Sequence, residues 1–112
     1  MLRIRDPKPS LAFYQDVMGM KLFTTMEMPA GGFNVYFLGY PGKLGLPPAE
    51  AATEMQYLFK REGMLELTWN YGTEKQEGFS YHDGNKDPQG FGHICENFFP
   101  PLPVAVNAID TK

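Results

Sequence analysis

The chain has 112 residues, enough for one domain and too few for two independent hydrophobic cores, and its 43% hydrophobic and 14% aromatic content is that of a globular protein. Its formal net charge of −3 argues against a nucleic-acid-binding surface, which needs clustered basic side chains. No apolar run reaches the ~20 residues that span a bilayer, no secretory signal opens the chain, and the single cysteine, Cys95, fits a reducing compartment, so we expect a cytoplasmic protein that contacts neither nucleic acid nor membrane.

The beginning of the chain is predicted to form a short strand and a helix. Apolar and basic residues alternate from Leu2 to Arg5, which is typical of a strand end, and two prolines then break the pattern. Ser10 is expected to cap a helix over about residues 10–18, where apolar positions recur at helical spacing, and Gly19 is expected to end it.

A hairpin and a long loop are predicted next. Residues 21–26 and 33–40 are rich in β-branched and aromatic side chains, and a turn with proline and two glycines at 29–32 joins them. Pro41–Thr53 carries several glycines, prolines and alanines, which predicts a long loop that can hold a short helical turn near residues 49–52.

A third long strand is predicted over Met64–Trp69, where side chains alternate in character. Because successive side chains of a strand point to opposite faces, this alternation assigns each residue to a face. Leu65, Leu67 and Trp69 are expected on one face, and Met64, Glu66 and Thr68 on the other.

The remainder of the chain is predicted to be largely irregular. Asn70–Gly90 is polar and contains glycines, as loops do, and Phe91–Cys95 is expected to start a further strand. From about Asn97 onward, closely spaced prolines argue against helix and strand. With 12 glycines and 10 prolines, little chain is left to build a core, so we expect an incomplete domain.

Glu66 and His93 are the first candidates for chemistry, because each lies in a strand-like segment made otherwise of apolar residues or glycine. A carboxylate and an imidazole are ligands that suit Zn²⁺ or another divalent first-row metal. A glutamate on the solvated face of a sheet and a structural histidine are the alternative interpretations. No short metal-binding motif such as HExxH or CxxC is present, so the residues alone indicate at most a partial, two-ligand site.

Basic and polar residues near the strands are weaker candidates. Arg3 and Arg5 alternate along a strand and form either a solvated face or a clamp for an anionic substrate. Asn70 follows a strand end, where a turn residue is the simpler interpretation. Met28, beside Pro29, fills a gap in the core or lines a ligand pocket.

Several segments together resemble a known family. MLRIRDP at 1–7, SLAFY at 10–14 and GMKL at 19–22 open the chain, LELTWNYGTE follows at 65–74, and GN, DP and GFGHI lie within 84–94. In this order and spacing they resemble the glyoxalase I (lactoylglutathione lyase) family, a branch of the vicinal-oxygen-chelate superfamily. The resemblance extends from Met1 to about Cys95.

The resemblance implies an α+β fold built from paired βαβββ modules that curl around a metal. Residues 1–95 are then expected to form an incomplete glyoxalase domain, with one βαβββ module and the start of a second, and residues 96–112 an irregular, proline-rich tail without family resemblance. The family isomerises the hemithioacetal of methylglyoxal and glutathione into S-lactoylglutathione, which detoxifies methylglyoxal. A divalent cation, Zn²⁺ or alternatively Ni²⁺, polarises the substrate oxygens.

The resemblance also implies roles for individual residues. By position, Glu66 and His93 match metal ligands of the family, and Arg3 and Asn70 match residues that hold the glutathione part of the substrate. A hydrophobic pocket is matched more loosely, by Met28, Phe33 and Phe37.

This sequence departs from the family pattern in three respects. The family's four metal ligands include a glutamine before the position of Met1 and a second glutamate, also the general base, beyond Cys95. A glutathione-binding arginine is replaced by Gln89. Two of four ligands and no catalytic base are therefore expected here. In the family the equivalents of Glu66 and His93 come from different modules, so without the second module the strand edges and one face of the sheet are expected to be exposed. Such exposure favours self-association.

Three functional interpretations stay open on the sequence. The first is a glyoxalase I-like protein. The second is a catalytically silent fragment or interaction module of the same fold, for which the isolated chain should show no turnover. The third is a metal-independent small-molecule binder of the same superfamily.

Overall fold

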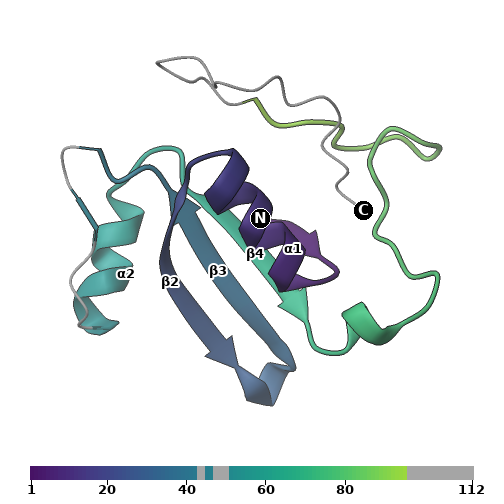
Figure 1. The fold of residues 1–112 in the computed structure, drawn as a ribbon, viewed down its shortest axis with the longest axis horizontal. Coiled ribbons are helices and arrows are strands. Elements are labelled where there is room, and N and C mark those ends of the chain that lie inside the picture. The colour runs from purple at the N-terminus through teal and green to yellow at the C-terminus, as the bar shows by residue number, and fades with distance from the viewer. Residues whose placement is uncertain (43–44, 47–50, 96–112) are drawn as a thin grey trace.

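The computed structural model describes residues 1–42, 45–46 and 51–95, with only the backbone of residues 51–54, and arranges them as a sheet with helices on both sides (Figure 1). The elements in chain order are strand β1 (Leu2–Ile4), helix α1 (Pro7–Ala12), a π-helical continuation η1 (Phe13–Val17), β2 (Lys21–Met28), a 3-10 turn η2 (Pro29–Gly31), β3 (Phe33–Gly39), helix α2 (Ala51–Phe59), β4 (Leu65–Asn70) and a 3-10 turn η4 (Thr73–Lys75).

The four strands form one mixed sheet in the order β1-β4-β3-β2. β1 runs parallel to β4, with Arg3 opposite Thr68, whereas the β2–β3 and β3–β4 pairs are antiparallel. This is a βαβββ module, as the resemblance implies, and it leaves β1 and β2 as the edge strands.

The first helix begins earlier than predicted. Its N-cap is Asp6, whose carboxylate accepts a hydrogen bond from the Lys8 backbone N–H at 3.0 Å, so Ser10 is not the cap. Pro7 is tolerated because the first helical position needs no N–H donor. The predicted end is confirmed, because Gly19 follows the helix with a φ of 72°, a left-handed conformation that favours glycine.

The hairpin is confirmed with small changes in its bounds. β2 continues to Met28, two residues beyond the predicted end, and a bulge lies between Leu22 and Thr24. Gly32, at the end of the turn, has a φ of 73°, which is the reason this turn needs a glycine.

Helix α2 is the main element that the sequence analysis missed. Residues 51–52 of the expected helical turn are helical, whereas its residues 49–50 lie outside the described chain. The helix continues to Phe59, although a loop was expected as far as Thr53 and no element beyond it. Leu58, only 2% exposed, packs with Phe37 and the half-buried Met55. Burial of one helix face stabilises a segment whose local composition alone is ambiguous.

The predicted further strand is wrong. Residues 91–95 form no regular structure, because no other strand among the described residues pairs with them. A compact loop precedes them, closed by a hydrogen bond of 2.9 Å from the Gly90 N–H to the Gly84 carbonyl. The irregular tail expected over 96–112 lies outside the described residues. Within the described chain, no helix has the length and apolar character needed to cross a membrane.

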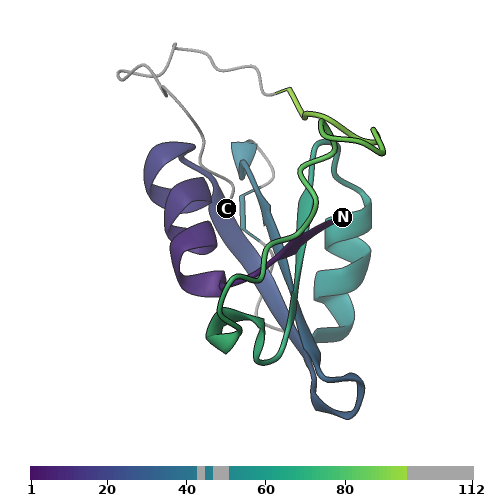
Figure 2. The same cartoon turned by 90° about the vertical axis from the view of Figure 1, so that its right-hand side faces the viewer.

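The two helices lie on opposite sides of the sheet (Figure 2), and a hydrophobic cluster is buried on each face. We call the face under the first helix the α1 face and the opposite one the α2 face. The buried residues of the α1 face are Ile4, Tyr14, Met18, Met20, Tyr36, Leu38 and Leu67. Those of the α2 face are Phe23, Val35, Phe37 and Leu58.

Candidate functional site

The strand register brings most of the predicted site residues to the α2 face. Glu66 and Asn70 are four positions apart on β4, so they share a face, and Phe37 is directly opposite Glu66. The pairing of Arg3 with Thr68 adds β1 to the same surface. The predicted site residues on this face are Arg3, Met28, Phe33, Phe37, Glu66 and Asn70.

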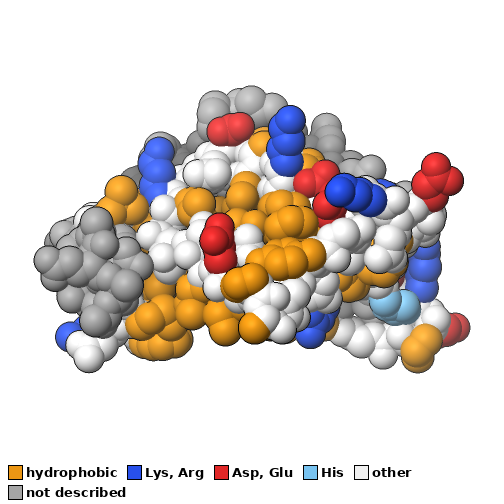
Figure 3. Space-filling model, turned by 90° about the horizontal axis from the view of Figure 1, so that it is seen from below, with side chains coloured by type: hydrophobic (Ala, Val, Ile, Leu, Met, Phe, Trp, Pro, Cys, Tyr) orange, Lys and Arg blue, Asp and Glu red, His pale blue; other side chains and the backbone are white. Residues whose placement is uncertain are grey.

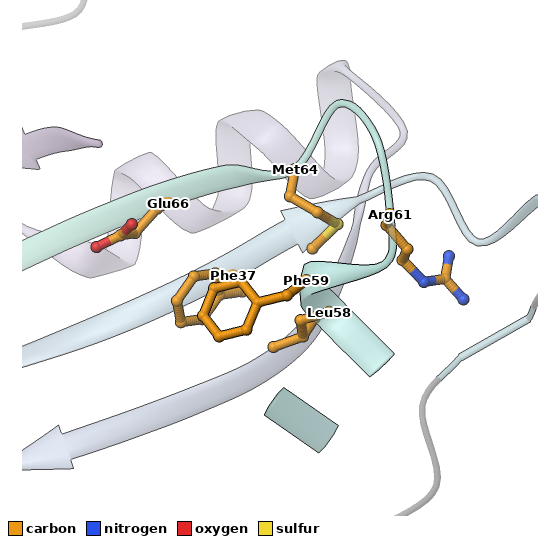
Figure 4. A pocket seen from close by; sticks show the side chains of 6 residues that line it. All are labelled: Phe37, Leu58, Phe59, Arg61, Met64 and Glu66. Carbon is orange, nitrogen blue, oxygen red and sulfur yellow. The ribbon is translucent and has the colours of Figure 1, made fainter. Parts of the chain in front are cut away.

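A hollow of about 190 Å³ opens on this face between the end of α2 and the sheet. It is lined by Phe37, Leu58, Phe59, Arg61, Met64 and Glu66 (Figure 4). The Glu66 carboxylate lies at one side, whereas the Arg61 guanidinium points away from it. The lining is therefore mainly apolar around one carboxylate.

Exposed apolar side chains lie both at the hollow and elsewhere on this face. Met28 is 41% exposed and Phe59 is 74% exposed, although both are large hydrophobic residues. Seen from below, hydrophobic side chains gather across the end of the molecule where β2 and β3 are joined (Figure 3). Exposed apolar surface of this kind is typical of a face that receives a ligand or another protein layer.

Glu66 is half-buried and has no hydrogen bond or ion pair with another described residue. A carboxylate beside Phe37 and Leu58 loses part of its hydration, and no local donor replaces it. A cation bound from outside the described chain would compensate this cost. The environment of Glu66 thus suits a ligand for a hard or borderline divalent cation.

The described residues supply only part of such a metal site. No three His, Cys, Asp or Glu side chains come together anywhere in residues 1–42, 45–46 and 51–95. His93 is exposed and lies after the sheet, so its predicted place inside a strand is wrong. A donor set of this size does not fit a complete metal centre, and no reaction step through a metal follows from it.

Arg3 and Arg5 differ in a way that their alternation along the strand did not reveal. Arg5 donates hydrogen bonds to the backbone carbonyls of Thr73 (3.3 Å), Glu74 (3.4 Å) and Gln76 (2.9 Å), so the anion-clamp interpretation is wrong for Arg5. Arg3 is exposed and its guanidinium has no partner among the described residues. Arg3 remains available to an anionic ligand.

Asn70 is the last residue of β4 and is half-buried. Its Nδ2 donates to the Tyr81 hydroxyl at 3.4 Å, and its backbone carbonyl accepts from the Thr73 hydroxyl at 3.0 Å. Asn70 therefore lies at the end of the strand, two positions beyond the residue that pairs with Arg3, and the Thr73 hydroxyl holds its backbone.

Leu58, Phe59 and Arg61 line the hollow but were not predicted as site residues. Because helix α2 was missed, the surface it forms over the sheet was missed too. The signal was present in the spacing of Met55, Leu58 and Phe59, which is i, i+3, i+4 and typical of one helix face.

Arg61 fixes the segment that leads away from β3. Its guanidinium lies 4.5 Å from the ring centroid of Phe23 and 4.8 Å from that of Tyr57. It also donates to the carbonyls of Pro41, at 2.9 Å, and Gly45. One side chain thus connects α2, the sheet and the following loop.

Comparison with known proteins gives consistent matches. The profile described as the Glyoxalase/Bleomycin resistance protein/Dioxygenase superfamily matches residues 1–98. Glyoxalase I of Saccharomyces cerevisiae is 48% identical over 95 residues, which are 85% of this chain and 26% of that protein. Lactoylglutathione lyase of Pseudomonas aeruginosa is 44% identical over 112 residues, 99% of this chain and 61% of that protein.

Solved structures match as well. A glyoxalase I from Leishmania major, described as trypanothione-dependent, is similar over 70% of this chain and 48% of its own, with 29% sequence identity and a TM-score of 0.47. The chain spans less than two thirds of the length of each of these relatives.

Proposed function

The chain belongs to the Glyoxalase/Bleomycin resistance protein/Dioxygenase superfamily, and we propose that its α2 face is one half of a lactoylglutathione lyase active site. The proposed reaction converts the hemithioacetal of methylglyoxal and glutathione into S-lactoylglutathione. The observation that carries the proposal is that Arg3, Glu66 and Asn70 share one face of the sheet, with Arg3 and Glu66 unpaired among the described residues.

We assign the charged end of glutathione to Arg3 and Asn70. A free guanidinium binds a carboxylate through charge-assisted hydrogen bonds, and an amide adds both a donor and an acceptor. The apolar surface of Met28, Phe33 and Phe37 would receive the carbon substituent on the sulfur. Because these groups come from the four strands of one sheet, their relative positions are set before the ligand arrives.

We assign a divalent cation, Zn²⁺ or Ni²⁺, to Glu66, with His93 as a second ligand that would complete a site together with a partner module. The cation would polarise the substrate oxygens. The remaining ligands and the carboxylate that moves the proton are proposed to come from a second module, in a longer chain or a second copy. The single free cysteine supports a reducing, cytoplasmic setting.

A second candidate is a glutathione-binding module without turnover. It is favoured by the small number of metal-binding side chains on the α2 face. Among the residues that line the hollow, Glu66 is the one carboxylate. Both candidates require the same ligand-binding face, so binding and turnover must be measured separately.

The test is a titration of the full chain with S-methylglutathione, which carries the charged groups without a reactive carbonyl. Arg3→Ala and Asn70→Ala are each expected to weaken the affinity about 10-fold, the loss of a charge-assisted hydrogen bond. Lys21→Ala, an exposed residue at the start of β2, is the control and should bind as the wild type does. Equal affinity of Arg3→Ala and wild type would contradict the proposal.

Turnover is tested by following thioester formation from the hemithioacetal with added Zn²⁺ or Ni²⁺. For the chain alone we expect no rate above the uncatalysed reaction, because the proton-transferring carboxylate is assigned elsewhere. A metal-dependent rate that Glu66→Gln abolishes would show that copies of this chain complete the site, and would exclude the second candidate.

A further inference from the structure

We infer that Arg5 and Thr73 are positioning residues that set the distance between Arg3 and Asn70. This inference rests on the proposed function of Arg3 and Asn70 in binding glutathione. It adds two residues that need not touch the ligand: Arg5, which the sequence offered only as an anion clamp, and Thr73, which the sequence pattern did not single out.

Hydrogen bonds run in both directions between Arg5, which follows β1, and the turn after β4. The Arg5 side chain donates to three carbonyls of the turn, those of Thr73, Glu74 and Gln76. In return, the Thr73 hydroxyl lies 2.5 Å from the Arg5 carbonyl and 3.0 Å from the Asn70 carbonyl. Thr73 is only 6% exposed, so these bonds are shielded from competing water.

These hydrogen bonds lie just beyond the point where the pairing of β1 with β4 ends. β1 has three residues, and its pairing with β4 ends at Ile4 opposite Trp69. Arg5 follows the end of β1, and Asn70 is the last residue of β4, where it pairs with Phe33 of β3 but with no residue of β1. The Arg5–Thr73 contacts replace that pairing just beyond the paired region.

Carbonyl groups at the end of the η4 turn explain why a cation is suited to this place. Carbonyls at such a turn carry partial negative charge. Two of the three already accept a backbone hydrogen bond, that of Thr73 from the Gln76 N–H at 3.2 Å and that of Gln76 from the Phe79 N–H at 3.3 Å. The Arg5 guanidinium adds a second donor to these two and also donates to the Glu74 carbonyl, because its donors are fixed in a planar fork, which a lysine lacks. Because the Arg5 guanidinium donates to these carbonyls, it is unavailable to an anionic ligand. Arg3 is then the arginine that binds such a ligand.

The test compares Arg5→Met and Thr73→Val with wild type in the full chain, by NMR signals of the Asn70 carboxamide and by titration with S-methylglutathione. Both variants are expected to shift or broaden the Asn70 signals and to weaken affinity about 10-fold. Arg5→Lys should recover part of the loss. Lys75→Met, which removes an exposed charge from the same turn, is the control and should change neither readout.

A double variant separates positioning from general destabilisation. If Arg5 acts through Asn70, Arg5→Met should weaken binding no further in an Asn70→Ala background. An equal, additive loss in that background, or unchanged Asn70 signals in both single variants, would overturn the inference. If wild type does not bind S-methylglutathione, the proposed function fails, and the Asn70 signals alone then decide whether Arg5 and Thr73 position this residue.

Discussion

The two faces of one sheet are used in opposite ways. The α1 face buries Leu38 and Leu67 completely and encloses its apolar side chains beneath the helix. The α2 face is covered at one end only and presents Arg3 and Glu66, neither of which has a partner among the described residues, and, on β2, the exposed Met28. The same three strands therefore supply folding energy through one set of alternating positions and ligand chemistry through the other.

The largest expected effect lies on the α1 face. Leu67→Ala should lower the free energy of unfolding by about 3 kcal/mol, because a fully buried leucine leaves a cavity that the sheet cannot close. Met28→Ala on the α2 face, where the side chain is 41% exposed, should cost less than about 1 kcal/mol. Urea unfolding of both variants measures the contrast, and equal losses would break the distinction between the faces.

Arg61 tests how the covered end of the α2 face is held. Arg61→Met removes the hydrogen bonds to the carbonyls of Pro41 and Gly45 and the ring contact with Phe23, which should cost about 2 kcal/mol of unfolding free energy. Lys60→Met changes the exposed neighbour and should cost almost nothing. A loss within the error of the control would mean that the packing of α2 alone holds this end.

The sequence predicted what depends on local periodicity. The side of the sheet on which Glu66 lies follows from its alternation with Leu65 and Leu67, and the hairpin follows from its turn residues. Helix α2 was missed because its apolar spacing is short and follows a run rich in glycine and proline, so its stability depends on burial against the sheet.

What the sequence did not predict depends on contacts between distant residues. Arg3 and Arg5 have the same local pattern, and only a contact across 68 residues, between Arg5 and Thr73, distinguishes them. The place of His93 is likewise undetermined locally, because a strand requires a neighbouring strand and none of the described residues provides one.

Replacement of Glu66 should affect stability and metal binding in opposite directions. Glu66→Leu should raise the free energy of unfolding by about 0.5 kcal/mol in metal-free buffer, because it removes a half-buried carboxylate that has no donor beside Phe37. The same change should abolish Zn²⁺ binding measured by titration. Glu62→Leu, on an exposed residue, is the control for removal of charge. A destabilised Glu66→Leu variant would indicate that the carboxylate supports the fold, contrary to its assignment as a ligand.

Glu74 provides the smallest effect and the opposite case, a carboxylate whose donors lie within the chain. Its pKa is lowered chiefly by a hydrogen bond with its own backbone N–H, and burial opposes this with the next largest effect. The hydrogen bond from the Trp69 indole at 3.0 Å, the charge of Lys75 and the Gly72 backbone lower the pKa further. A group with a lowered folded-state pKa adds stability above its unfolded pKa of about 4.3, and this stability is lost as the pH falls through the folded value. Wild type should therefore lose more stability than Glu74→Gln between about pH 5 and about pH 3. Glu77→Gln removes an exposed carboxylate from the same turn as a control, and parallel acid-unfolding curves for wild type and Glu74→Gln would show that the Trp69 contact does not hold the charge.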